Sequence, residues 1–308
     1  MDFGSYLPLL LPLLAVPLVL LSARHLHPAA ATWLTAAACA ALTLGAAVSL
    51  ALFTLAGLAG LSIVVDLGHL SASALGHTHI TDLPIDSTAA VLLVAACAAA
   101  ITATAHRVRA LREADRRTAP ATGSDLVVLP HDRPVAHAVP GRPGRIVIST
   151  GMLAGLTAAE RRALLAHERA HLNRSHHLFV AVVDVFAAAN PLLRPLRKVV
   201  RYTTERWADE AAARAVGSRS TVARAVGKAA LATKDATTRD PVTLAAAGGE
   251  VPRRVAALLA TPPARRLRRL LTTPTTVFAL AAIGLTIASI GCAAEAAGDL
   301  QHALWLAR

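Results

Sequence analysis

Two histidines and a glutamate near the middle of the chain have the types and spacing of a metal-dependent hydrolytic site. The five residues from His167 to His171 read H-E-x-x-H. They lie in the stretch 158–172, which contains neither Gly nor Pro and keeps its apolar residues on one face, so we expect a helix. Residues four apart project from the same face of a helix, one turn apart. Both imidazoles can therefore bind one Zn²⁺, with Glu168 beside the metal.

This motif predicts the role of each of its residues. Zinc lowers the pKa of a bound water from about 15.7 towards roughly 7. Glu168 would accept a proton as that water attacks a carbonyl, and would pass it to the leaving amine, so we expect a general base rather than a ligand. Thr157 and Glu160 form the S/T-x-x-E signal that starts such a helix. The alternative is a chance match on a solvated helix of a chain rich in His, Ala and Arg.

A third ligand is expected downstream, because a catalytic zinc site has three protein ligands and one open position. Glu205 lies in another stretch without Gly or Pro, and a second helix there would return it to the metal. Asp209 follows four residues later on the same face. It is placed to accept a hydrogen bond from the second ring nitrogen of a ligating histidine. The alternative is a solvated acidic face that pairs with Arg201 or Arg206.

The pattern H-E-x-x-H followed by E-x-x-x-D, with Ala-Asp-Glu-Ala-Ala at 208–212, resembles a known family. It is similar to the gluzincin membrane metallopeptidases of the HtpX and CAAX-prenyl-protease kind, and closer still to the BlaR/MecR-type peptidases. The resemblance extends over about 126–217. The resemblance implies that the zinc ligands are His167, His171 and Glu205. It also implies that Glu168 is the general base and that Asp209 supports a ligand.

The chain departs from the antibiotic-sensing members after its last apolar segment. About a dozen residues follow it, Glu295 to Arg308. We therefore expect no C-terminal penicillin-binding sensor domain, and no β-lactam-sensing role.

The composition predicts a polytopic membrane protein. The chain of 308 residues is 55% hydrophobic and 16% charged, with a mean hydropathy of +0.52. We expect a mainly α membrane protein with about four transmembrane helices and an inserted α+β zincin-like catalytic domain. The predicted membrane helices are about 6–22, 33–57, 87–105 and 276–294. The predicted domains are a membrane region at 1–109, a zinc metallopeptidase domain at 110–274, and a last membrane helix with a short tail at 275–308.

The placement of arginines predicts the orientation. The loop 61–86 has no Lys or Arg, whereas arginines cluster at 107–117 and again at 265–269. Positive residues flank the cytoplasmic side of membrane helices, so we expect a multi-pass protein of the cell membrane with a cytoplasmic catalytic domain. The net charge of +12 is then explained by arginines that face anionic lipid of the bilayer. No nucleic-acid-binding signature is present, and nucleic acid is not an expected partner.

Three short strands separated by Pro and Gly turns are predicted at 125–129, 135–139 and 145–150. Proteases often bind an extended substrate as an added strand at an exposed sheet edge. The strand 145–150 is the candidate edge, and the alternative is an ordinary core strand. The candidate substrate-binding residues on it are Arg145, Ile146, Val147 and Ile148.

Other residues near the motif keep open interpretations. His137, His176 and His177 are either a fourth group near the metal or, as we favour, solvated or bonded to backbone. Tyr202 and Arg214 are candidate donors to the oxyanion.

Two segments beside the motif helices are also left open. The segment 178–189 is either a buried core helix or a helix that enters the bilayer. The Thr-, Ala- and Gly-rich segment 232–251 is either a surface loop, which we favour, or a lid.

The sequence therefore favours an integral-membrane zinc endopeptidase that acts on a protein or peptide at the cytoplasmic face. Its role is regulatory cleavage, for example of a repressor, or quality control of membrane proteins. The alternative is a non-catalytic zinc-binding scaffold or signal transducer. An intact Glu168 argues against that alternative, because a pure zinc scaffold needs no carboxylate between its histidines.

Overall fold

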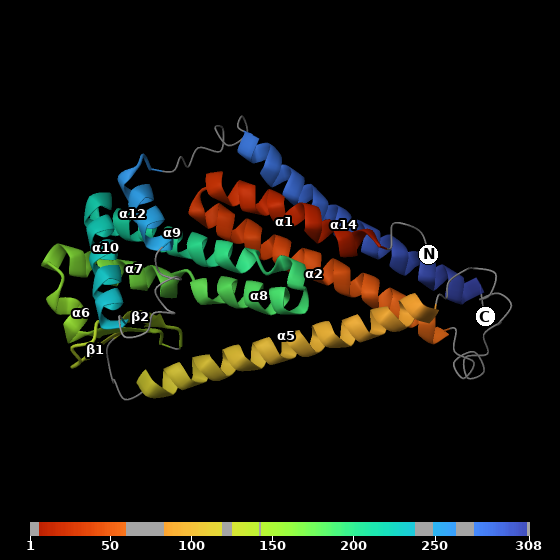
Figure 1. Ribbon diagram of the computed structural model, residues 1–308, viewed down its shortest axis with the longest axis horizontal. Coiled ribbons are helices and arrows are strands. Elements are labelled where there is room, and N and C mark those ends of the chain that lie inside the picture. The colour runs from red at the N-terminus through yellow and green to blue at the C-terminus, as the bar shows by residue number, and fades with distance from the viewer. Residues whose placement is uncertain are drawn as a thin grey trace.

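The fold is mostly helical and elongated. The structure is a computed structural model that describes residues 6–59, 83–118, 125–141, 143–237, 249–262 and 274–306. Long helices extend from one end of the molecule, and shorter helices with a small sheet gather at the other (Figure 1). The predicted outside loop at 61–86 and the predicted excursion at 232–251 lie largely outside the described residues.

Four long helices form the extended part: α1 (Leu7–His25), α2 (Pro28–Ala59), α5 (Leu83–Thr118) and α14 (Pro274–Leu306). Within the described residues, three stretches are long and apolar enough to cross a membrane, Leu7–His25, Pro28–Leu58 and Pro84–Arg116. The three N-terminal membrane helices expected from the sequence are thus confirmed as candidates, with longer bounds. In α14 the apolar part is shorter, Val277–Cys292, so a fourth crossing stays a prediction.

α5 joins the two parts of the molecule. Its first half exposes large apolar side chains, and Val91, Val94 and Ile101 are each 68% exposed. An apolar surface of this kind is stable against lipid. Its second half continues past the predicted end at 105 and reaches the sheet (Figure 1). The same helix therefore leads from a candidate membrane span to the smaller domain.

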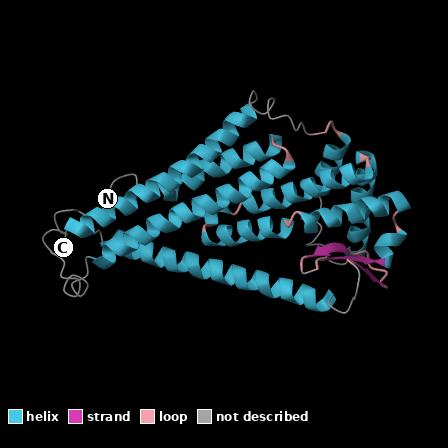
Figure 2. Cartoon of the chain, turned by 180° about the vertical axis from the view of Figure 1, so that it is seen from behind, coloured by secondary structure: helices cyan, strands magenta, loops and turns pink. Residues whose placement is uncertain are grey.

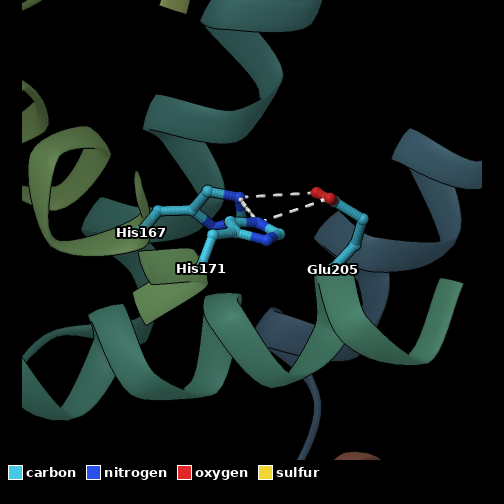
Figure 3. A group of neighbouring side chains, drawn as sticks. All are labelled: His167, His171 and Glu205. Atoms are coloured by element: carbon cyan, nitrogen blue, oxygen red, sulfur yellow. Dashed lines mark hydrogen bonds and ion pairs between the residues drawn. The ribbon is translucent and has the colours of Figure 1, made fainter. Parts of the chain in front are cut away.

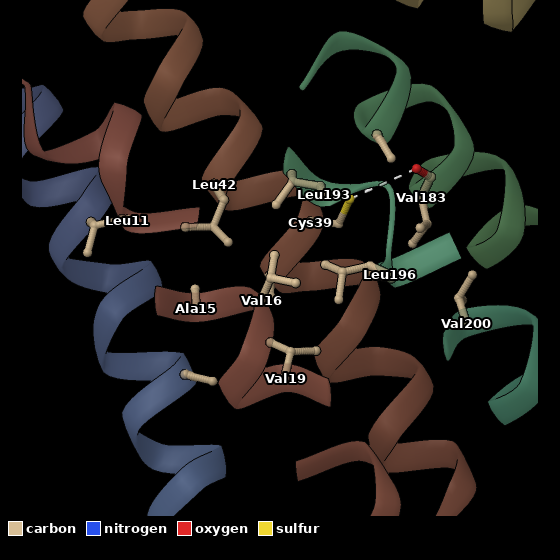
Figure 4. Close-up of a cluster of buried hydrophobic side chains, with 14 residues drawn as sticks. Leu11, Ala15, Val16, Val19, Cys39, Leu42, Val183, Leu193, Leu196 and Val200 are labelled. Carbon is tan, nitrogen blue, oxygen red and sulfur yellow. Dashed lines mark hydrogen bonds between the residues drawn. The ribbon is translucent and has the colours of Figure 1, made fainter. Parts of the chain in front are cut away.

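A helical hairpin anchors the smaller domain to the long helices. It consists of α8 (His176–Ala189), the short 3₁₀ helix η2 (Pro191–Leu193) and α9 (Leu196–Val216). Thr32 of α2 donates a hydrogen bond of 3.0 Å to Thr203 of α9. Figure 4 shows the apolar core that this hairpin shares with α1 and α2, which includes Leu11, Val16, Val19, Cys39, Leu42, Val183, Leu193, Leu196 and Val200.

In the smaller domain α7 (Ala158–Asn173) packs against α9 and α10 (Arg219–Thr237), and α12 (Glu250–Leu259) packs against α10 and α9. Small and branched side chains, among them Ala163, Ala212 and Val222, fill the space between these helices. α7 begins with the predicted capping box: the Thr157 N–H donates to Glu160 Oε2 at 2.9 Å, and the Glu160 N–H donates to the Thr157 hydroxyl at 3.3 Å.

The three predicted strands form one sheet, with β1 (Leu126–Leu129), β2 (Ala136–Val139) and β3 (Arg145–Ser149) in the order β1-β3-β2 (Figure 2). β3 pairs in parallel with β1 and antiparallel with β2. A short helix, α6 (Thr150–Ala154), follows it.

The prediction that 145–150 is an exposed edge is wrong, because β3 is the central strand and both of its edges are paired. Its apolar residues are buried, with Ile146 and Ile148 at 0% and Val147 at 2% exposure. Arg145 pairs with Asp115 of α5 instead. The predicted substrate-binding residues therefore have no free strand edge on which a substrate strand could pair. They are Arg145, Ile146, Val147 and Ile148.

Candidate active site

The two helices that the sequence predicted bring together three side chains that could hold a metal ion. α7 contributes His167 and His171, one turn apart, and α9 contributes Glu205 (Figure 3). The two Nε2 atoms lie 3.1 Å apart, and each lies 3.4 Å from a Glu205 carboxylate oxygen. Ligand atoms at about 2.0–2.1 Å from a tetrahedral zinc ion lie roughly 3.3 Å from one another. The spacing therefore fits a single zinc ion.

The protonation states favoured by the surroundings suit a cation at two of the three side chains, His171 and Glu205. Burial lowers the pKa of His171 to about 4, so its imidazole is neutral at physiological pH. Burial alone would raise the pKa of Glu205, but contact with His167 and the charge of Arg254 hold it below its ordinary value. Neutral imidazole and ionised carboxylate are the forms that bind zinc. Burial alone would lower the pKa of His167, but its contacts with Asp209 and Glu205 raise it to about 10, so zinc binding there would displace a proton from the ring.

A buried ion-pair network supports two of these three side chains. Asp209 is fully buried, and its Oδ1 lies 3.1 Å from Nδ1 of His167. Arg254 of α12 donates two hydrogen bonds to Asp209, of 2.9 and 2.7 Å, and its Nη1 lies 2.8 Å from Glu205 Oε2. The sequence reasoning missed Arg254. No local sequence pattern distinguishes it from its neighbour Arg253, which is exposed and lies over the ring of Tyr202.

His176 supports the other histidine. Its Nδ1 lies 3.1 Å from Nδ1 of His171, and its ring is 1% exposed beside Trp207. Burial and the nearby His171 lower the pKa of His176 to about 3, so its ring is neutral and its Nδ1 can accept a hydrogen bond from the N–H of His171. The favoured prediction of a solvated or backbone-bonded histidine is therefore wrong. His176 contacts a candidate ligand and lies outside the group of three that could hold the metal.

Glu168 lies in the same cleft as the three candidate ligands. Its side chain is buried, and burial raises its pKa above the ordinary value for glutamate, against the opposing effects of His167 and the Ala138 backbone. A carboxylate with a raised pKa is a stronger proton acceptor, as a general base requires.

The cleft has a volume of about 400 Å³ and lies between the two motif helices, α5 and β2. Ala136, His137 and Ala138 of β2 line one side, and His177 also faces the cleft. Two arginines, Arg107 of α5 and Arg201 of α9, line the cleft as well. The two candidate oxyanion donors, Tyr202 and Arg214, are not among the described residues that line it.

Residues 98–187 match the model of the family described as Peptidase family M48. The matched segment includes the second half of α5, the sheet, the H-E-x-x-H helix and most of α8, and it ends before Glu205, Asp209 and Arg254. No curated protein and no solved structure matches the chain. The family match supports a zincin-like metallopeptidase, and the apolar helices are consistent with membrane association.

Proposed function

We propose that this chain is an integral-membrane zinc endopeptidase that cleaves protein substrates at the cytoplasmic face of the membrane. The observation that carries the proposal is the placement of Glu168 in one cleft with His167, His171 and Glu205. A base beside a two-histidine, one-glutamate metal site is the arrangement needed for hydrolysis of a peptide bond. The family match over the same helix supports it independently.

The residues divide the chemistry among them. His167, His171 and Glu205 would hold zinc, which when bound supplies Lewis-acid polarisation of the scissile carbonyl and of water. Glu168 would accept a proton from the attacking water and donate it to the leaving amine. The low exposure of this carboxylate keeps bulk water from competing for that proton.

The substrate would bind along β2. This strand pairs with β3 on one side, whereas three of its residues line the cleft. A peptide added beside it in extended form would gain main-chain hydrogen bonds and would pass the candidate metal site. β2 thus takes the role that the sequence had assigned to residues 145–150.

The membrane arrangement supports action on membrane-associated or membrane-proximal proteins. α5 leads from an apolar stretch directly into the cleft, where Arg107 forms part of the wall. The arginine-rich end of α5 argues for the cytoplasmic side. Regulatory cleavage of a repressor-type protein, as in BlaR/MecR-type peptidases, and quality control, as in HtpX-like peptidases, are the two roles that this location suits.

The first test compares new protein N-termini in host cells that carry wild type or Glu168→Gln. The substitution keeps the size of the side chain and the metal ligands but removes the base. We expect some cytoplasmic or membrane proteins to be cut with wild type alone. The same pair, purified with zinc bound, is then compared on casein as a general unfolded substrate. Equal behaviour of both proteins in both assays would instead support the non-catalytic scaffold or signal transducer.

A further inference from the structure

Three arginines surround one carboxylate at the end of the cleft where α5 enters it. Asp184 of α8 accepts a hydrogen bond of 2.7 Å from Arg107, and bonds of 3.2 and 3.3 Å from Arg201. Nε of Arg197 lies 3.7 Å from the same carboxylate, and its Nη2 donates to the Asp184 backbone carbonyl at 3.0 Å. Three guanidinium charges thus share one negative charge, and this cluster has an excess of positive charge.

Two of the three arginines face the cleft. The side chains of Arg107 and Arg201 are 35% and 57% exposed, and both line the cleft, whereas Arg197 is not among its lining residues. A guanidinium has five N–H donors in a planar fork that fits a carboxylate. Asp184 uses few of these donors, so the pair Arg107 and Arg201, here named the arginine pair, can bind a second carboxylate. Asp184 would hold both guanidinium groups in place while that second carboxylate is bound.

The arginine pair lies close to the candidate metal site. Both arginines line the cleft that contains the three candidate ligands, and the backbone of Arg201 precedes that of Glu205 by one helical turn on α9, about 6 Å along the helix axis. An extended peptide advances about 3.3 Å per residue. A side chain within about three residues of the cleaved bond would therefore reach the arginine pair.

We propose that Arg107 and Arg201 form a subsite for an acidic side chain of the peptide substrate, within about three residues of the bond that is cleaved. This inference deepens the proposed peptidase function and rests on it. A lipid phosphate could satisfy the same guanidinium groups. The arginine pair lines the same cleft as Glu168 and the metal-binding group, which favours the peptide, because a carboxylate bound there lies on the path of a substrate.

The experiment uses the full-length protein, purified with zinc bound and placed in vesicles of neutral phosphatidylcholine. A mixed peptide library is digested, and the sequences around each cut are read by mass spectrometry. We expect Asp and Glu to be enriched within three residues of the cut. For one cut peptide, replacing the acidic residue by its amide should raise KM about two- to fivefold, as expected for one partly exposed ion pair, with little change in kcat.

Variants assign the preference to the arginine pair. In Arg201→Gln the acidic and amide peptides should be cut equally well, whereas Arg162→Gln, on the exposed face of α7, should keep the preference. In Arg201→Glu, a peptide with Lys at the critical position should become the better substrate. A gain of this kind cannot result from misfolding. The zinc content of each variant is measured to show that the metal site is intact.

The outcomes separate this inference from the proposed function. If the wild-type protein, like the Glu168→Gln variant, cuts neither a peptide nor casein, the peptidase proposal itself is overturned. Cuts without an acidic preference, or with a preference that persists in Arg201→Gln and Arg107→Gln, would overturn the subsite and leave the peptidase standing. An effect of Arg201→Gln that ignores peptide charge and appears only in vesicles with anionic phosphatidylglycerol would assign the arginine pair to lipid.

Discussion

Arg254 donates two hydrogen bonds to the buried carboxylate of Asp209, although the two residues are 45 positions apart in the chain and lie on different helices. The same guanidinium approaches Glu205 to 2.8 Å. Arg254 therefore fixes both a candidate ligand and the carboxylate that orients His167. Groups that orient metal ligands typically contribute 10- to 100-fold to metal affinity.

We accordingly predict that Arg254→Gln weakens zinc binding by about 10- to 100-fold, because Glu205 and Asp209 lose their shared cation. Zinc affinity is measured by competition with a chelator of known affinity. Arg253→Gln is the matched control, since Arg253 is exposed on the same helix and contacts the ring of Tyr202. Equal zinc affinity of the two variants would contradict the positioning role of Arg254.

A second prediction concerns His176. Its Nδ1 lies 3.1 Å from Nδ1 of His171, and accepting a hydrogen bond from that nitrogen would fix the His171 tautomer in which Nε2 is free for the metal. Replacing it by Phe keeps the aromatic packing beside Trp207 but removes the acceptor. We expect His176→Phe to lose about 10-fold or more in zinc affinity while its melting temperature without metal stays close to that of wild type. His177→Phe, one residue further, should retain wild-type zinc affinity.

The difference between these residues and the motif shows what a sequence can predict. The spacing of His167 and His171 is a local property of one helix, so it could be predicted, and so could the return of Glu205 on a second helix. The contacts of Arg254 and His176 depend on how α12 and α8 pack on these helices, and no local pattern encodes that packing. They become visible only in the assembled domain.

The sheet provides a second lesson. The three strands could be predicted because Pro and Gly turns separate short apolar runs. The order of the strands could not, but one signal was available. Ile146, Val147 and Ile148 form a continuous apolar run, which is typical of a strand buried on both faces, and not of an edge that alternates apolar and polar residues. β2, whose residues line the cleft, is less apolar and contains His137.

The metal-binding group itself leads to a graded prediction. Single replacement of His167, His171 or Glu205 by Ala removes one of three candidate ligands and should abolish zinc binding at stoichiometric metal. Asp209→Ala removes a group that only orients a ligand, so it should weaken binding by about 10- to 100-fold without abolishing it. Zinc per protein is measured by atomic absorption after dialysis. Full occupancy in Glu205→Ala would contradict its assignment as a ligand.

The last prediction concerns the start of α7, the helix that presents both histidines. Glu160 is buried, and its carboxylate accepts from Lys228 Nζ at 2.8 Å and from the Thr157 backbone. These hydrogen bonds, that of Lys228 first, lower its pKa to about 2 from an ordinary value of 4.5. A carboxylate whose pKa is lowered by folding stabilises the folded state fully above pH 4.5, and this contribution is lost as the pH falls towards 2.

Glu160→Gln isolates that contribution, because a glutamine at this position can still complete the capping box but carries no charge. We expect the variant to melt about 2–4 °C below wild type at pH 6, and the difference to narrow at pH 3, where the unfolded wild-type chain has taken up the proton. Thermal unfolding is followed by circular dichroism in detergent at both pH values.

Lys228→Gln should reproduce most of the loss of stability at pH 6, and the double variant should add little to it, because both changes break the same ion pair. A difference between wild type and Glu160→Gln that stays constant from pH 6 to pH 3 would show that the charge of Glu160 does not stabilise the start of α7.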